Sequence, residues 1–191
     1  MKRITLSTLA VALLLLAGCV VTSVYPYYTA KDVTFDPALL GTWSDPAKTN
    51  ADAEAWVFEK LEAQTYKWTV RESKETNAFD AHLFTLGGAK FLDALPRERA
   101  EYNTPAHVLL RVIRLQPQLE LQILSYDWLA KLVESKPKAI RHVVVPKEAG
   151  SSDKGGGLLT LTADTAELQK FIRKHLNNTN AWGEPLVMKK Q

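Results

Sequence analysis

The chain has 191 residues, and its 24 lysines and arginines against 21 aspartates and glutamates give it a formal charge of +3. Charged residues are interspersed, and no basic cluster is interleaved with aromatic residues, which argues against a nucleic-acid partner. The single cysteine excludes an internal disulfide, so stability must come from a packed core.

The first residues have the pattern of a secretory signal peptide. Lys2 and Arg3 precede an apolar run over residues 4–16, and the small pair Ala17-Gly18 follows. The run is too short to cross a membrane, because a spanning helix needs about 20 apolar residues. We therefore predict that residues 1–18 form a signal peptide that is removed.

The end of this segment, Leu16-Ala17-Gly18-Cys19, resembles the lipobox of bacterial lipoproteins. The resemblance implies that Cys19 becomes the mature N-terminus, with a diacylglyceryl group on its sulfur and a fatty acid such as palmitate on its amine. Two or more acyl chains hold a protein stably at a membrane. Val20 in place of aspartate implies, by the same resemblance, an outer-membrane location facing the periplasm. The alternative is an ordinary secreted protein with a stray cysteine.

The remaining residues divide into a tether and one domain. Residues 19–36 show no clear period, so we predict a lipidated cysteine followed by a flexible tether. Residues 37–191 suffice for a single β-rich domain of ordinary size.

Strand patterns begin early in the domain. Strands are predicted over residues 56–61 and 65–71. The second alternates, with Tyr66, Trp68 and Val70 on one face and polar or charged side chains on the other. Such alternation is typical of an antiparallel sheet with one face in water.

Two hairpins follow. Gly87-Gly88 separates apolar segments at residues 79–86 and 89–94, and this pair supplies the positive φ angles that a tight hairpin needs. A second hairpin is predicted to join residues 108–115 to 119–124. Shorter strands are predicted at residues 142–145, 158–161 and 186–188.

Two segments change to a helical period. Residues 126–134 place their large apolar side chains on one stripe, and residues 164–176 open with Asp164 and Glu167 in an arrangement like a capping box. Residues 147–157, rich in glycine and serine, are predicted to be a mobile loop.

About eight to ten short strands joined mainly by hairpins predict a mainly β fold, an antiparallel barrel or curled sheet with two short helices. The segment that runs from Asp36-Pro37 to Gly41-Thr42-Trp43 resembles the entry of a lipocalin, where a helical turn precedes Gly-x-Trp on the first strand. The resemblance implies an eight-stranded barrel whose closed end is plugged by Trp43. It says little about a ligand.

A barrel of about eight strands can leave room for one small ligand. The candidate ligand-binding residues are aromatic and lie on predicted strands: Trp56, Tyr66, Trp68, Phe79 and Phe91. Aromatic side chains on one strand face also fill small barrels, so a packed core is the alternative interpretation.

No catalytic or cofactor motif stands out. His82, His107 and His142, with Asp80, fall on predicted strands, but no short ligand motif selects a metal geometry. The nucleophile elbow Gly-x-Ser-x-Gly is absent from the sequence. We therefore predict no enzymatic activity, no catalytic residue, no metal and no cofactor.

The leading functional hypothesis is a membrane-anchored lipoprotein whose lipocalin-like domain binds a small apolar or amphipathic ligand. The alternative is a non-catalytic structural or adaptor lipoprotein that docks an envelope protein, through the helix around Trp128 or the loop at 147–157. In both, the membrane is contacted through Cys19.

Overall fold

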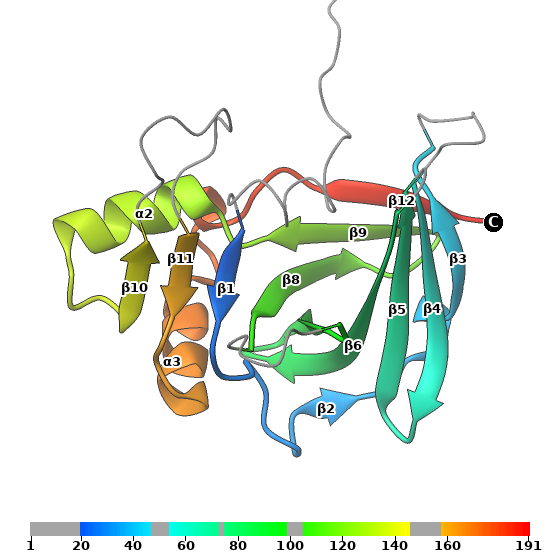
Figure 1. The fold of residues 1–191 in the computed structure, drawn as a ribbon, viewed down its shortest axis with the longest axis horizontal. Coiled ribbons are helices and arrows are strands. Elements are labelled where there is room, and N and C mark those ends of the chain that lie inside the picture. Colours follow the sequence, from blue (N-terminus) through cyan, green and yellow to red (C-terminus); the bar gives the residue numbers. More distant parts are fainter. Residues whose placement is uncertain (1–19, 47–53, 73–74, 99–104, 146–157) are drawn as a thin grey trace, which may run out of the picture.

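Eight antiparallel strands close into a barrel in this computed structural model, which describes residues 20–46, 54–72, 75–98, 105–145 and 158–191 (Figure 1). The predicted signal peptide, Cys19 and the predicted loop at 147–157 lie outside the described residues. The barrel strands are β3 (Gly41–Ser44), β4 (Ala55–Glu62), β5 (Thr65–Glu72), β6 (Glu75–Leu86), β7 (Ala89–Pro96), β8 (His107–Arg114), β9 (Gln118–Ile123) and β12 (Leu186–Lys190).

The last strand of the chain closes this barrel. β12 pairs with β3 through Lys190 and Trp43, and with β9 through Met188 and Leu119. Pairing of β8 with β9 completes the ring. The prediction of a mainly β, antiparallel barrel with two short helices is therefore confirmed.

Alternation along the barrel strands directs one face of each strand inward. On β5, Tyr66, Trp68 and Val70 are at most 2% exposed, as their alternation predicted. The inward side chains form a cluster that we call the barrel core. Its buried members are Val20, Leu39, Trp43, Trp56, Phe58, Tyr66, Trp68, Val70, Phe79, Ala81, Leu83, Leu92, Ala94, Val108, Leu110, Val112, Leu119, Leu121 and Met188.

Three strands extend the sheet beyond the barrel, in the order β1 (Val21–Ser23), β11 (Leu158–Leu161) and β10 (His142–Val145). β8 forks between this side sheet and the barrel. Its Val108 pairs with Thr22 of β1, whereas Leu110 pairs with Ile123 of β9. The side sheet therefore continues directly from a barrel strand.

Two helices, α2 (Tyr126–Ser135) and α3 (Thr165–His175), lie on the same side of the molecule as this side sheet (Figure 1). They pack in a second cluster, the helix-side core, with the outward side chains Phe84, Phe91 and Leu109 of the barrel strands. Barrel strands β6, β7 and β8 thus bury side chains on both faces. Among the described residues, no helix is long and apolar enough to cross a membrane.

Local signals in the sequence place the turns and helix starts. Gly87 and Gly88 form the β6–β7 turn with φ angles of 60° and 82°. The Asp164 side chain accepts a hydrogen bond from the Glu167 backbone N–H at 3.0 Å, and so caps α3. The Ser125 side chain does the same for α2, accepting from Trp128 at 3.3 Å.

The prediction of a flexible tether is wrong from Val20 onward. β1 pairs with β8 and β11, and the short strand β2 (Val33–Thr34) pairs with β6. Between them, Tyr27 is fully buried. β1 has only three residues, too few to show the alternation by which a strand is recognised in a sequence. It forms because β8 and β11 supply hydrogen-bonding partners on its two sides.

A short 3-10 helix, η1 (Pro37–Leu39), plugs one end of the barrel, which we call the plugged end. Leu39 is fully buried, and its carbonyl oxygen accepts a hydrogen bond from Nε1 of Trp43 at 2.9 Å. Nζ of Lys190 lies 5.2 Å from the centre of the Trp43 ring and donates to the Ala38 carbonyl at 3.3 Å. Asp36 caps this helix, accepting from the Ala38 N–H at 3.1 Å.

Replacing Gly41 by alanine is expected to destabilise the plugged end. Gly41 has a φ of 116°, and a Cβ there would lie 3.0 Å from Cε of Lys190. A side chain at positive φ costs about 1–2 kcal/mol before any displacement of that lysine. Urea unfolding should show a larger loss of stability for Gly41→Ala than for Gly88→Ala, where φ is 82° but an added Cβ would meet no atom of the described residues within 4 Å, apart from its chain neighbours. Equal losses of unfolding free energy in the two variants would mean that the close contact with Lys190 does not contribute to the destabilisation.

Candidate functional site

The structure brings together four of the five aromatic residues predicted to bind a ligand. Trp56, Tyr66, Trp68 and Phe79 belong to the barrel core. Phe91 points to the other face of β7 and packs in the helix-side core against Phe84 and Trp182, with ring centroids 5.5 and 5.8 Å apart. It is therefore not part of an internal site with the other four.

The rings inside the barrel pack directly against one another. The centroid of Trp68 lies 5.2 Å from that of Trp56, 5.4 Å from Phe58 and 5.1 Å from Phe79. Phe35 stacks on Tyr66 at 4.9 Å. Such separations are those of aromatic side chains in contact, so the centre of this aromatic cluster is occupied by the protein itself.

Most polar atoms of these aromatic residues have partners. Trp56 Nε1 donates to Oε1 of Glu54 at 2.6 Å, and Tyr66 Oη donates to the Asp36 carbonyl at 3.1 Å. Burial raises the pKa of the Tyr66 hydroxyl. Trp68 Nε1 is the exception, because it is buried without a hydrogen-bond partner in the described part of the chain.

This difference predicts unequal effects for two matched substitutions. Trp56→Phe removes a hydrogen bond to a buried carboxylate, an interaction typically worth about 1.5–3 kcal/mol, whereas Trp68→Phe removes a donor that has no partner. We expect the first to lower the urea midpoint more than the second. A greater loss for Trp68→Phe would contradict this assignment.

A buried polar cluster lies on the outer face of the barrel. Asp93, only 1% exposed, accepts a hydrogen bond from the Tyr27 backbone N–H at 2.9 Å. Its other oxygen lies 2.7 Å from Nδ1 of His107. The Asp93 carboxylate thus joins the segment that follows β1 to β7 and β8, which is a structural role.

A second histidine lies beside this cluster. His82 stacks on Tyr28 with ring centroids 4.6 Å apart, and its Nδ1 lies 3.0 Å from Tyr28 Oη. Burial lowers the pKa of His82, while burial and the nearby Asp93 charge raise the pKa of Tyr28 to about 12. In the described residues, no group of three or more potential metal ligands is close enough to hold an ion.

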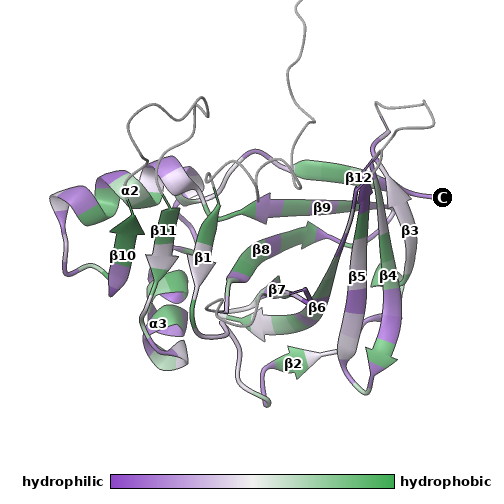
Figure 2. Ribbon diagram, viewed as in Figure 1, coloured by the Kyte–Doolittle hydropathy of each residue, from purple (hydrophilic) through white to green (hydrophobic). Residues whose placement is uncertain are grey.

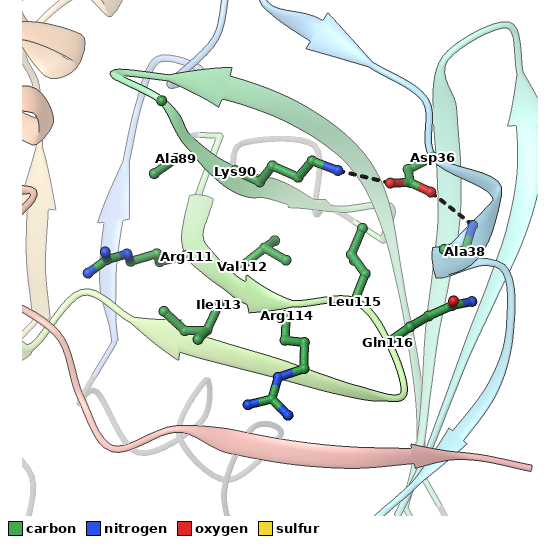
Figure 3. Close-up of a pocket in the computed structure, with 11 residues that line it drawn as sticks. Asp36, Ala38, Ala89, Lys90, Arg111, Val112, Ile113, Arg114, Leu115 and Gln116 are labelled. Atoms are coloured by element: carbon green, nitrogen blue, oxygen red, sulfur yellow. Dashed lines mark hydrogen bonds and ion pairs between the residues drawn. The ribbon is translucent and has the colours of Figure 1, made fainter.

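An open groove of about 700 Å³ lies at the plugged end, between η1, the β6–β7 turn and the end of β8 (Figure 3). Its apolar lining includes Val112, Ile113 and Leu115. Its basic lining residues are Lys90, Arg111 and Arg114. The groove therefore combines apolar side chains with cations, a combination that suits an amphipathic anion.

The cations of this groove all have partners, however. Lys90 donates to Asp36 at 2.9 Å, a contact that lowers the pKa of that carboxyl. Arg114 lies 3.2 Å from Glu120, and Arg111 donates to the Leu176 carbonyl at 3.3 Å. An anion would have to compete with the carboxylates, so the electrostatic attraction is modest.

Comparisons with known proteins offer no family for this chain. No family model, curated protein or solved structure matches it.

A second groove, of about 590 Å³, lies between the C-terminal ends of α2 and α3. Leu132, Ala139 and Pro137 give it a largely apolar lining, and Lys174 and His175 contribute from α3. Trp128 lies on α2, the helix predicted from the sequence as a possible docking surface, and its side chain is half-buried. Its ring contacts those of Phe171 and His175 at 6.0 and 4.9 Å.

Sequence reasoning missed the plugged-end groove, whereas the second groove lies beside the helix around Trp128 that it had named. The plugged-end groove takes its lining from η1, from the start of β7 and from the end of β8, which are far apart in the sequence. Its cations follow no local motif. Only the barrel closure places Lys90 beside Asp36, so no pattern in the chain could have indicated this site.

Proposed function

We propose that this protein is a bacterial envelope lipoprotein, anchored through acyl groups on Cys19 at the outer membrane, whose barrel is a non-catalytic adaptor for another envelope protein. The lipobox-like residues that end at Cys19 support the anchor. The filled aromatic centre of the barrel supports the adaptor, and it is the observation on which the choice depends.

A ligand inside the barrel would compete for space with the packed aromatic rings. A ligand inside the barrel would have to separate Trp68 from Trp56, Phe58 or Phe79, each now in ring contact with it. Opening such a packed cluster forfeits dispersion contacts and exposes apolar surface. A filled barrel is instead well suited to hold outer surfaces in a fixed geometry.

The groove between α2 and α3 is the best candidate for the docking surface. Its lining is mainly apolar, and Lys136, Lys138 and Lys174 surround it. Helix-in-groove recognition uses an apolar anchor, with charges of the opposite sign around it. The partner that fits best is therefore a protein segment with apolar side chains flanked by acidic ones.

The adaptor and carrier functions predict opposite results with lipid probes. Oleic acid and lysophosphatidylethanolamine, titrated into the purified protein, are expected to leave its tryptophan emission unchanged, because four of the tryptophans are buried. A saturable change that Trp68→Phe abolishes would instead support an internal carrier.

Docking is tested by placing a photo-crosslinking amino acid at Leu132 in the full chain, in intact envelopes. We expect it to trap one defined protein, and to lose that product when Lys174 is replaced by glutamate. The same amino acid at Leu61 on β4 is the control, since Leu61 is exposed but outside the groove. Identical products from both positions would contradict docking at this groove.

The plugged-end groove supports a second candidate function, binding of an amphipathic anion at the surface of the barrel. Ile113, 44% exposed, lies between the cations Arg111 and Arg114 along β8. If this groove holds lysophospholipid, Ile113→Glu should weaken the binding at least tenfold, measured by isothermal titration, without loss of the fold. Unchanged binding would exclude the groove.

A further inference from the structure

An exposed apolar surface lies at the outer edge of the side sheet. Val143 and Val145 of β10 and Leu158 of β11 are 50%, 53% and 46% exposed. β10 is coloured as strongly hydrophobic in Figure 2, although it is the last strand of the sheet. We call Val143, Val145 and Leu158 the edge patch.

The three side chains of the edge patch share one face of the sheet. Val145 lies opposite Leu158, and Val143 lies two residues away on the same strand. Val144, between them, is opposite Leu159, which is buried in the helix-side core, although Val144 itself is 45% exposed at the edge of that face. Because side chains alternate along a strand, the edge patch faces away from that core.

The start of the described chain lies beside this patch. β1 runs parallel to β11 with Val21 opposite Leu159, a register that puts Val20 next to Leu158. Val20 is only 6% exposed and forms a β-bridge with Ser125. Since neighbouring strands are about 4.8 Å apart, Val145 is about two strand spacings from Val20.

Cys19 precedes Val20 directly, and consecutive Cα atoms are about 3.8 Å apart. Acyl chains on Cys19 would therefore begin at the surface of the fold, and no tether would separate the domain from the bilayer. The exposed side chains nearest to that point would be brought to the lipid headgroups. Valine and leucine are favoured there, because contact with acyl chains removes their surface from water.

We propose that the edge patch rests on the bilayer beside the anchor, so that Val143, Val145 and Leu158 enter the lipid interface. The inference depends on the acylation of Cys19 proposed above. The partner is a lipid surface, and no particular headgroup is required, because the patch itself is apolar. The side sheet thereby sets how the barrel is oriented on the membrane.

The contact is tested with single cysteines in the full chain. Once Cys19 is acylated, Val145→Cys provides the only free thiol, and Leu61→Cys provides a matched control. Leu61 is 42% exposed and lies on β4, across the barrel from β10 in Figure 1. Each protein is labelled with a nitrobenzoxadiazole fluorophore and reconstituted into phosphatidylethanolamine and phosphatidylglycerol vesicles that contain a doxyl-labelled lipid.

The label at position 145 is expected to shift to shorter wavelength and to be quenched several-fold more than the label at 61. Val143→Cys, on the same face, should behave like position 145 and guards against a local folding defect. Equal quenching at 145 and 61 would overturn the proposal. Mass spectrometry of the N-terminal peptide distinguishes failure of the proposed anchor from failure of the proposed membrane contact. Without acyl groups the anchor and this inference both fail, whereas an acylated protein with unquenched labels removes the membrane contact alone.

Discussion

Cys19→Ser is expected to release the protein from the membrane completely. A serine hydroxyl cannot replace the thiol that the lipobox resemblance assigns as the site of diacylglyceryl transfer. Each buried methylene contributes about 0.8 kcal/mol to membrane binding, so loss of the acyl chains removes stable anchoring. In a bacterium that processes lipoproteins, the wild type should incorporate labelled palmitate and sediment with membranes, whereas the variant should do neither.

Ser7→Ala is the matched control for this experiment. It changes a hydroxyl within the apolar run and leaves Leu16-Ala17-Gly18-Cys19 intact, so labelling and sedimentation should persist. If the Cys19→Ser protein still sediments with membranes and glycerol labelling is unaffected, the anchor is not at this residue. The protein would then be held by another interaction or secreted.

Asp93→Ala is expected to cause the largest loss of stability of any single substitution considered for the barrel. The carboxylate is 1% exposed and bonds both the Tyr27 N–H and the His107 ring. Its removal leaves two buried polar groups without their partner. A buried polar group left without its partner typically costs about 1–3 kcal/mol, and here two such groups are affected. Urea unfolding of the full chain should show a loss of this size.

The comparison is with Asp80→Ala on the neighbouring strand. Asp80 forms an ion pair of 3.3 Å with Arg97, and its side chain is 33% exposed. Such a surface pair contributes about 1 kcal/mol or less. Hydrogen exchange should also accelerate at Tyr27 in Asp93→Ala and not in Asp80→Ala. Similar losses in both variants would show that Asp93 does not hold the segment that follows β1 to the barrel.

Elements whose causes are local followed from the sequence. The inward face of β5, the Gly87-Gly88 turn and the cap at Asp164 were all predicted and are all present. Each depends on residues close together in the chain: alternating side chains, glycines that accept positive φ, and a carboxylate that reaches the N–H three residues on.

The side on which Phe91 lies could not be predicted. On β7, Phe91 and Leu92 are both fully buried, one facing the helices and the other facing the barrel interior. Alternation of polarity disappears where both faces of a strand are covered. The sequence therefore provided no indication of which residues Phe91 would contact. For this reason Phe91 was grouped with the residues of the barrel core, although it belongs to the helix-side core.

The ordered structure of residues 20–36 also could not be predicted from the sequence. Their sequence is irregular, yet β1 and Tyr27 belong to the fold because β8, β11 and Asp93 supply backbone and side-chain partners from far along the chain.

Residue types and their short-range spacing carry the resemblance to a lipobox, and they determined the turns, the β class and the strands of the barrel. Tertiary structure decided the closure by β12, the filled interior, both grooves and the position of Val20 beside the edge patch. The physical reason is that these interactions act over different distances along the chain. Caps and turns act within a few residues, whereas burial and strand pairing depend on partners that only the folded chain brings together.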